Sequence, residues 1–115
     1  MSDLSGKTVV VTGAAGNVGR AVAEAFAARD AVLVLVDHNP AGLERVAADL
    51  HCATPPLVVP TDLLDPQSVT ALAERVAREH GGADVLANVA GGFFMGPLLH
   101  ETADKDWDHM LDLNA

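Results

Sequence analysis

Tyrosine is absent from this 115-residue chain, and the only aromatic residues are three phenylalanines and one tryptophan. Because half of the residues are hydrophobic, the core must consist mainly of valine, leucine and alanine. Cysteine occurs once, which excludes a disulfide framework within the chain and the paired spacing of a zinc site. We therefore interpret Cys52 as a small buried apolar residue.

Basic residues are scarce as well, with 7 Lys and Arg against 16 Asp and Glu and a formal net charge of −9. Nucleic acids and anionic membranes are bound by clustered lysine and arginine, so we expect neither as a partner. No apolar run is long enough to span a bilayer, and no signal-peptide pattern opens the sequence. These features predict a cytoplasmic protein.

Two kinds of apolar pattern alternate along the chain. Continuous runs rich in valine and leucine predict strands that are buried on both faces, at residues 8–12, 31–36, 56–60 and 83–89. Apolar stripes at helical spacing follow each run: Val18, Val22, Ala25 and Phe26; Leu43, Val46, Ala47 and Leu50; Val69, Leu72, Ala73 and Val76; and Trp107, Met110, Leu111 and Asn114. Asn39-Pro40 and Asp65-Pro66 are typical helix starts.

This alternation predicts an α/β fold, a Rossmann-type doubly wound parallel sheet with the strand order 3-2-1-4. We expect an incomplete version with about four strands and four helices, forming a single domain over residues 1–115. Right-handed crossovers would place the first two helices on one face of the sheet and the third on the other. The fourth strand would lie at an edge.

Residues 12–19 read TGAAGNVG, directly between the first strand and the first helix. A glycine-rich turn at this point can hold the pyrophosphate of a dinucleotide at a helix N-terminus. Gly13 would permit the tight turn, Gly16 the close approach of a phosphate, and Gly19 the packing of helix on strand. Ala15, Asn17 and Val18 complete this candidate cofactor-binding turn. A Walker A loop is disfavoured because Arg20, rather than lysine, follows the last glycine.

Asp37 ends the second predicted strand, where an acidic side chain can accept hydrogen bonds from the ribose hydroxyls of adenosine. A carboxylate there also repels a 2′-phosphate, so NAD is favoured over NADP. Two alternatives stay open. Asp37 is also compatible with a simple turn in the sequence DHNP, and Arg20 and His38 would suit the 2′-phosphate of NADP.

Together with three later motifs, the glycine-rich turn resembles the N-terminal part of a short-chain dehydrogenase/reductase. TDLLD resembles the family's acidic motif, which implies that Asp62 and Leu63 hold the adenine ring. ANVAGG resembles the Asn-Asn-Ala-Gly motif, which implies that Asn88, Ala90 and Gly91 lie near the ribose and nicotinamide. WDHMLDLN resembles the helix that ends in the family's catalytic asparagine, here Asn114.

The sequence departs from the family's pattern at two places. The commonest spacing, TGxxxGxG, would put a glycine at position 17, whereas this chain has Gly16 and Asn17 and resembles the extended branch there. Val89 replaces the second asparagine of the Asn-Asn-Ala-Gly motif. The detailed phosphate contacts are therefore expected to differ from those of the common branch.

The resemblance implies hydride transfer between NAD(P) and a carbonyl or alcohol, with a tyrosine and a lysine that lie after a fifth strand. The given sequence stops at Ala115 and has no tyrosine. We therefore interpret it as the cofactor-binding half of a longer, homo-oligomeric oxidoreductase. Only the complete enzyme would bind a small-molecule substrate and use Asn114. The alternatives are a non-catalytic truncated fragment, a stand-alone nucleotide-binding module, and a structural domain with an emptied site.

Overall fold

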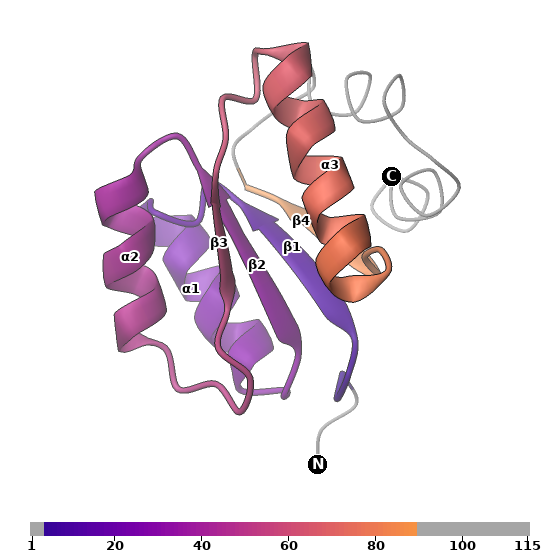
Figure 1. Cartoon of the computed structure of the whole chain (residues 1–115). Coiled ribbons are helices and arrows are strands. Elements are labelled where there is room, and N and C mark those ends of the chain that lie inside the picture. The colour runs from indigo at the N-terminus through magenta and orange to yellow at the C-terminus, as the bar shows by residue number, and fades with distance from the viewer. Residues whose placement is uncertain (1–3, 90–115) are drawn as a thin grey trace.

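The computed structural model describes residues 4–89, in which strands and helices alternate along the chain (Figure 1). The elements are β1 (Thr8–Thr12), α1 (Asn17–Ala27), β2 (Val32–Asp37), α2 (Pro40–Asp49), β3 (Leu57–Pro60), α3 (Pro66–His80) and β4 (Val85–Asn88). The predicted α/β alternation is confirmed, and β1 has the predicted bounds. The fourth predicted helix lies outside the described residues.

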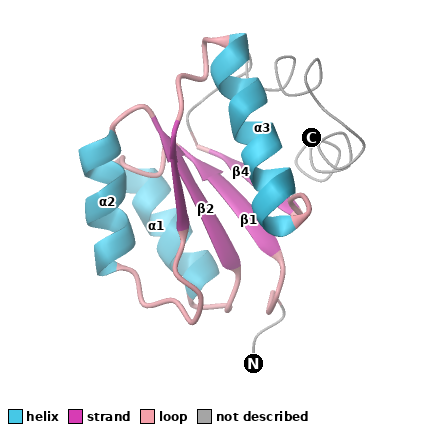
Figure 2. Ribbon diagram, in the orientation of Figure 1, coloured by secondary structure: helices cyan, strands magenta, loops and turns pink. Residues whose placement is uncertain are grey.

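The strands form one parallel sheet in the order β3-β2-β1-β4, as predicted (Figure 2). Val10 at the centre of β1 lies opposite Val34 of β2 and Leu86 of β4. Because all strands run in the same direction, their carboxyl ends meet at one edge of the sheet. Each following helix crosses back over a face before the next strand begins.

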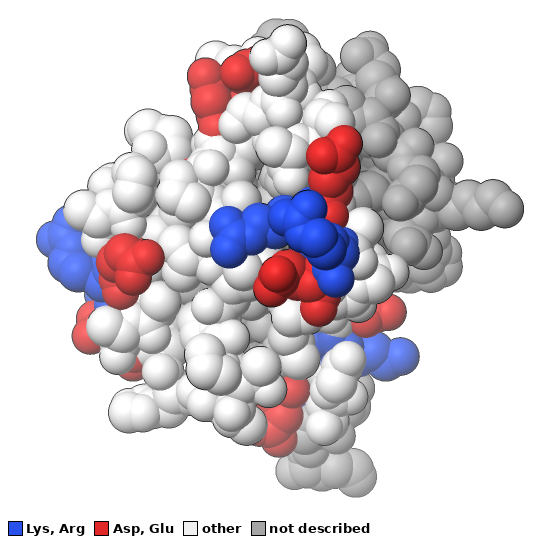
Figure 3. All heavy atoms as spheres, viewed as in Figure 1, with Lys and Arg blue, Asp and Glu red and all other residues white. Residues whose placement is uncertain are grey.

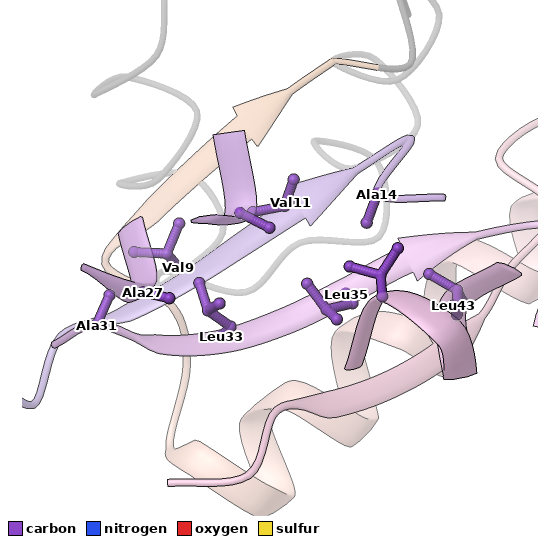
Figure 4. Close-up of a cluster of buried hydrophobic side chains, with 10 residues drawn as sticks. Val9, Val11, Ala14, Ala27, Ala31, Leu33, Leu35 and Leu43 are labelled. Atoms are coloured by element: carbon purple, nitrogen blue, oxygen red, sulfur yellow. The ribbon is translucent and has the colours of Figure 1, made fainter. Parts of the chain in front are cut away.

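The two faces of the sheet carry separate apolar cores, because successive side chains of a strand point to opposite faces. Val9, Val11, Leu33 and Leu35 pack with side chains of α1 and α2, as Figure 4 shows. The alternate residues of the same strands pack against α3. Figure 1 shows α1 and α2 on one side of the sheet and α3 on the other, which is the predicted arrangement.

The stripe expected to bury α1 is confirmed in part, because Val22 and Phe26 are half-buried against the core. Gly19, Ala23 and Ala27 are buried, whereas Val18 is 65% exposed and Ala25 is also exposed. The reason is the closeness of α1 to the sheet: a β-carbon built on Gly19 would lie only 1.9 Å from the carbonyl oxygen of Gly13. At that separation only small residues fit between the start of the helix and the turn, so Val18 is exposed, while Val22 and Phe26 pack on the core as partly buried side chains.

The stripes and starts predicted for α2 and α3 are confirmed. Leu43 and Val46 of α2 are buried, and so are all members of the α3 stripe. The Asn39 side chain accepts a hydrogen bond from the Gly42 N–H at 3.0 Å, and Asp65 accepts one from the Gln67 N–H at 3.0 Å. Each side chain satisfies an N–H group of the first helical turn that has no partner within the helix.

Cys52 is half-buried rather than fully buried, and it packs at the margin of the core between the sheet and helices α1 and α2. Burial raises the pKa of its thiol. Among the described helices, α1 to α3, none is long and apolar enough to cross a membrane.

Candidate functional site

The carboxyl edge of the sheet brings together residues that are far apart in the sequence. Thr12 at the end of β1 lies between Val36 of β2 and Asn88 of β4, and Asp37 follows next on β2. The glycine-rich turn leaves β1 at this point and leads into α1. The structure therefore places Asp37 and Asn88 on either side of the turn, as the fold prediction required.

The turn itself is built from backbone hydrogen bonds. Gly13 has a φ of +67°, a conformation that favours glycine, and its carbonyl oxygen accepts from the Gly16 N–H at 3.1 Å. The Ala14 N–H donates to the Val36 carbonyl oxygen at 3.1 Å, which extends the pairing of β1 and β2 by one residue. The turn is thus anchored to the sheet before the helix begins.

Gly16 is the residue that precedes α1, and no side chain caps this helix start. The N–H groups of Asn17, Val18 and Gly19 precede the first donor within the helix, Arg20, which donates to Gly16. Such a row of N–H groups, together with the positive end of the helix dipole, favours an anion. A β-carbon on Gly16 would meet only the Gly13 carbonyl oxygen, at an ordinary 3.5 Å. The fold itself therefore does not require a glycine here.

The carboxylate of Asp37 is almost buried, with 9% of the residue exposed, and it contacts the glycine-rich turn. Its Oδ2 accepts a hydrogen bond from the Ala15 N–H at 3.0 Å. Its Oδ1 accepts one from the His38 N–H at 2.7 Å, and Nδ1 of the exposed His38 ring lies 3.0 Å away. Asp37 thus joins the end of β2 to the turn, a contact that sequence reasoning did not foresee.

Thr12 is a residue that the sequence analysis did not assign to the site. It is fully buried, and its hydroxyl donates to Oδ1 of Asn88 at 3.1 Å and accepts from the Val89 N–H at 3.1 Å. The first bond holds the exposed Asn88 side chain, and the second holds the backbone directly after β4. The available signal was its position as the first residue of TGAAGNVG.

Asp62 lies after β3, in the loop that leads to α3. Its Oδ1 accepts a hydrogen bond from the Leu64 N–H at 3.0 Å, and its own N–H donates to the Ser68 hydroxyl at 2.9 Å. Asp62 is exposed, whereas Leu63 is half-buried against the core beneath α3. Leu64 is 76% exposed. The loop is therefore ordered by its own hydrogen bonds, with an acidic side chain facing outward.

Arg20 is held by two carboxylates rather than directed to Asp37. Its guanidinium donates to Glu24 at 3.2 Å and to Asp49 at the end of α2 at 2.6 Å. The hydrogen bonds to Glu24 and Asp49 raise the pKa of the guanidinium. On the face drawn in Figure 3, basic side chains likewise lie beside acidic ones.

Three predicted site residues, Ala90, Gly91 and Asn114, lie outside the described residues. Within residues 4–89, no group of three or more His, Cys, Asp or Glu side chains is arranged to hold a metal ion. The site that the structure describes is therefore a helix start flanked by Asp37 on one side and the Thr12–Asn88 pair on the other.

Comparison with solved structures supports a Rossmann-type fold for the chain. L-sorbose reductase from Gluconobacter frateurii, complexed with NADPH and L-sorbose, is 38% identical and superposes with a TM-score of 0.72 over 77% of this chain and 35% of its own. Hydroxysteroid dehydrogenase from Escherichia coli is 30% identical, with a TM-score of 0.71 over 77% of this chain and 38% of its own.

The family follows from the sequence comparisons. The family model described as short chain dehydrogenase matches residues 7–115, and the chain belongs to this family. It is 34% identical to 2,3-dihydro-2,3-dihydroxybenzoate dehydrogenase of Bacillus subtilis, over 97% of this chain and 43% of that protein. It is 38% identical to D-threitol dehydrogenase of Mycolicibacterium smegmatis, over 96% of this chain and again 43% of the relative. The chain thus spans less than half the length of these relatives.

Proposed function

We propose that this chain binds NAD(P) at its glycine-rich turn and supplies the cofactor-binding part of a short-chain dehydrogenase that acts on a carbonyl or alcohol. The observation that carries the proposal is the start of α1. This helix start lacks a side-chain cap, and the residue that precedes it is Gly16, where the ligand-free fold has room for alanine. A ligand that approaches the backbone closely explains both features.

The described residues have distinct roles in this proposal. The N–H groups of Asn17, Val18 and Gly19 would bind the pyrophosphate, and the outward Val18 side chain would pack on the cofactor. Asp37 and the Asp62–Leu63 pair would hold the adenosine half. Asn88, with Ala90 and Gly91 beyond it in the sequence, would contact the nicotinamide half. The cofactor, when bound, supplies the hydride donor or acceptor.

We propose NAD as the preferred cofactor. The Asp37 carboxylate lies beside the turn and would repel a 2′-phosphate, and Arg20 is engaged by Glu24 and Asp49. L-sorbose reductase from Gluconobacter frateurii, which this chain resembles in structure, is complexed with NADPH, so NADP is the alternative cofactor. Replacing Asp37→Ala is therefore expected to lower the ratio of NAD affinity to NADP affinity. An unaltered ratio in titration calorimetry would show that Asp37 does not select the cofactor.

Hydride transfer itself is proposed for the complete protein, in which Asn114 would have its catalytic role. The alternative, a non-catalytic nucleotide-binding module, predicts the same cofactor binding without turnover. The intact mass of the protein from its native source, compared with the reading frame beyond residue 115, separates the two. The absence of nucleic-acid and membrane partners, the homo-oligomeric state and the cytoplasmic location stay predictions.

Calorimetric titration of the 115-residue chain with NAD and with ADP tests the binding proposal. Binding of both is expected, and Gly16→Ala is expected to weaken both by at least about tenfold, because its methyl group would stand where the phosphate approaches. The melting temperature of this variant should change little, since the methyl group has room in the ligand-free fold. Unchanged affinities would contradict the assignment of the turn to phosphate binding.

A further inference from the structure

The Ala15 N–H lies between two others in the turn that have backbone partners. The Ala14 N–H donates to the Val36 carbonyl oxygen, and the Gly16 N–H donates to the Gly13 carbonyl oxygen, each at 3.1 Å. The Ala15 N–H donates instead to a side chain, Oδ2 of Asp37, at 3.0 Å. A carboxylate is a stronger acceptor than a carbonyl oxygen, so this bond is suited to fix the turn.

The Ala15 side chain is also packed closely against the first turn of α2. A β-carbon built on Gly42, in the first turn of α2, would lie 2.9 Å from the Ala15 β-carbon and 2.8 Å from Nδ2 of Asn39. Gly42 is buried, and its N–H is the one that the Asn39 cap holds. Ala15 is therefore held between the carboxylate at the end of β2 and the start of α2.

We propose that Asp37 is a positioning residue for the phosphate-binding turn. It acts through the Ala15 N–H, in addition to any contact that it makes with a ribose. This inference rests on the proposed function. The two carboxylate oxygens have different partners. Oδ2 accepts from the Ala15 N–H and so holds the turn. Oδ1 faces His38, whose ring is 86% exposed and can move aside when a ribose hydroxyl approaches.

The consequence is that Asp37 contributes to the binding of ligands that lack ribose hydroxyls. The test uses ADP and 2′,3′-dideoxy-ADP, which carry the same pyrophosphate and differ at the ribose. Both are titrated into the 115-residue chain and into Asp37→Ala. We expect Asp37→Ala to weaken both ligands by about tenfold, because the loss of a hydrogen bond to a charged group releases the turn. A loss confined to ADP would overturn the proposal, since Asp37 would then act only on the ribose.

Two further variants separate positioning from the ribose contact. Asp37→Asn keeps an oxygen acceptor for the Ala15 N–H, and it should restore most of the affinity for the dideoxy ligand. Gly42→Ala leaves the carboxylate in place and displaces Ala15, so it should weaken both ligands by a similar factor. Failure of both expectations would contradict the role of Ala15. These variants also decide the matter if Asp37→Ala does not fold.

Asp84→Ala is the matched control. In the unaltered chain, Oδ2 of Asp84 accepts from the Thr8 N–H at 2.9 Å. The variant therefore also loses a bond between a carboxylate and a backbone N–H, but at the opposite edge of the sheet. Its melting temperature should fall with unchanged affinity for both ligands. If Asp84→Ala lost as much affinity as Asp37→Ala, both losses would come from general destabilisation of the fold, and the proposal would be overturned.

Amide exchange of the ligand-free chain gives an independent readout. The Ala15 amide should exchange more slowly than those of Asn17 and Val18, and Asp37→Ala should accelerate it selectively. An Ala15 amide that exchanges as fast as those of Asn17 and Val18 would overturn the proposal. If the unaltered chain binds neither ADP nor its dideoxy analogue, the proposed function fails and the phosphate role of Asp37 fails with it. That outcome differs from a loss limited to the ribose contact.

Discussion

The first turns of α1 and α3 differ in what satisfies their backbone N–H groups. At α3, Asp65 caps the helix and Pro66 occupies the first helical position. At α1, the preceding residue is Gly16, which has no side chain to serve as a cap. Because an N-cap side chain contributes about 1 kcal/mol, α1 lacks a stabilisation that α2 and α3 both have. This difference is what the proposed phosphate site at the start of α1 requires.

The same comparison extends to packing. The fully buried residues of α3 are valine, leucine and alanine, whereas those of α1 are only glycine and alanine, with Val22 and Phe26 half-buried. Close approach of α1 places its N-terminus directly beside the end of β1, where Gly19 meets the backbone of Gly13 and Ala14. The start of α1 thus lies close to the strand because Gly19 has no side chain, whereas α3 is held by the burial of larger side chains.

The largest expected effect comes from adding a methyl group at the helix–strand contact of α1. Gly19→Ala would place its β-carbon 1.9 Å from one backbone atom of the turn and 2.6 Å from another, so helix and turn must separate. We expect a loss of about 3 kcal/mol in the free energy of unfolding, measured by urea denaturation. Gly16→Ala is the matched control, and a similar loss there would remove the distinction between the two glycines.

Converting the start of α1 into one like that of α3 is expected to abolish ligand binding rather than folding. Gly16→Asp would supply a capping carboxylate and also place a negative charge where the phosphate is proposed to bind. We expect the affinity for ADP to fall by at least about a hundredfold, which corresponds to about 2.7 kcal/mol. Stability should be unchanged or slightly raised. Retained ADP binding would show that the open helix start does not serve a phosphate.

Removing the cap of α3 should lower stability and leave ligand binding unchanged. Asp65→Ala leaves the Gln67 N–H without its side-chain partner and should cost about 1 kcal/mol of stability in urea denaturation. The affinity for ADP should be unchanged, because this cap lies at the start of α3 and not at the glycine-rich turn. A weakened affinity would instead connect the start of α3 to the ligand site.

The smallest effect is expected at the ion pair between α1 and α2. Asp49→Ala removes one of the two carboxylates that contact Arg20, and both partners are about half exposed. Solvent screens such pairs, so the free energy of unfolding, measured by urea denaturation, should hardly change. The affinity of this variant for NADP, measured by titration calorimetry, is more informative than its stability. An increase would show that Arg20, once released, reaches a 2′-phosphate.

Much of the fold was predictable because its signals are local. Asn39 and Asp65 are followed by proline and by apolar residues at helical spacing, so the starts and buried faces of α2 and α3 were predicted correctly. The α1 stripe was predicted only in part: Val22 and Phe26 do pack on the core, but Gly19 and Ala23 were missed because the sequence pattern ranks Val18 as more apolar than either. Only the distance between α1 and β1 makes the small residues the buried ones.

The candidate site shows the same division between sequence and structure. TGAAGNVG and the position of Asp37 were sufficient to predict a turn beside an acidic residue. The hydrogen bond from Ala15 to Asp37 was not predictable, because it depends on how β2 pairs with β1. The role of Thr12 in holding Asn88 depends likewise on the pairing of β1 with β4, which are separated by more than seventy residues.

The sequence alone therefore determined the element types, the strand order and the location of the glycine-rich turn. Periodicity, helix caps and crossover handedness are properties of short segments or of general topology. The tertiary structure decided which face of α1 is buried, which carboxylate oxygen of Asp37 holds the turn, and which residues the carboxyl edge brings into contact. These outcomes depend on distances between segments remote in the chain, which are fixed only when the parallel strands pair and the helices pack on them.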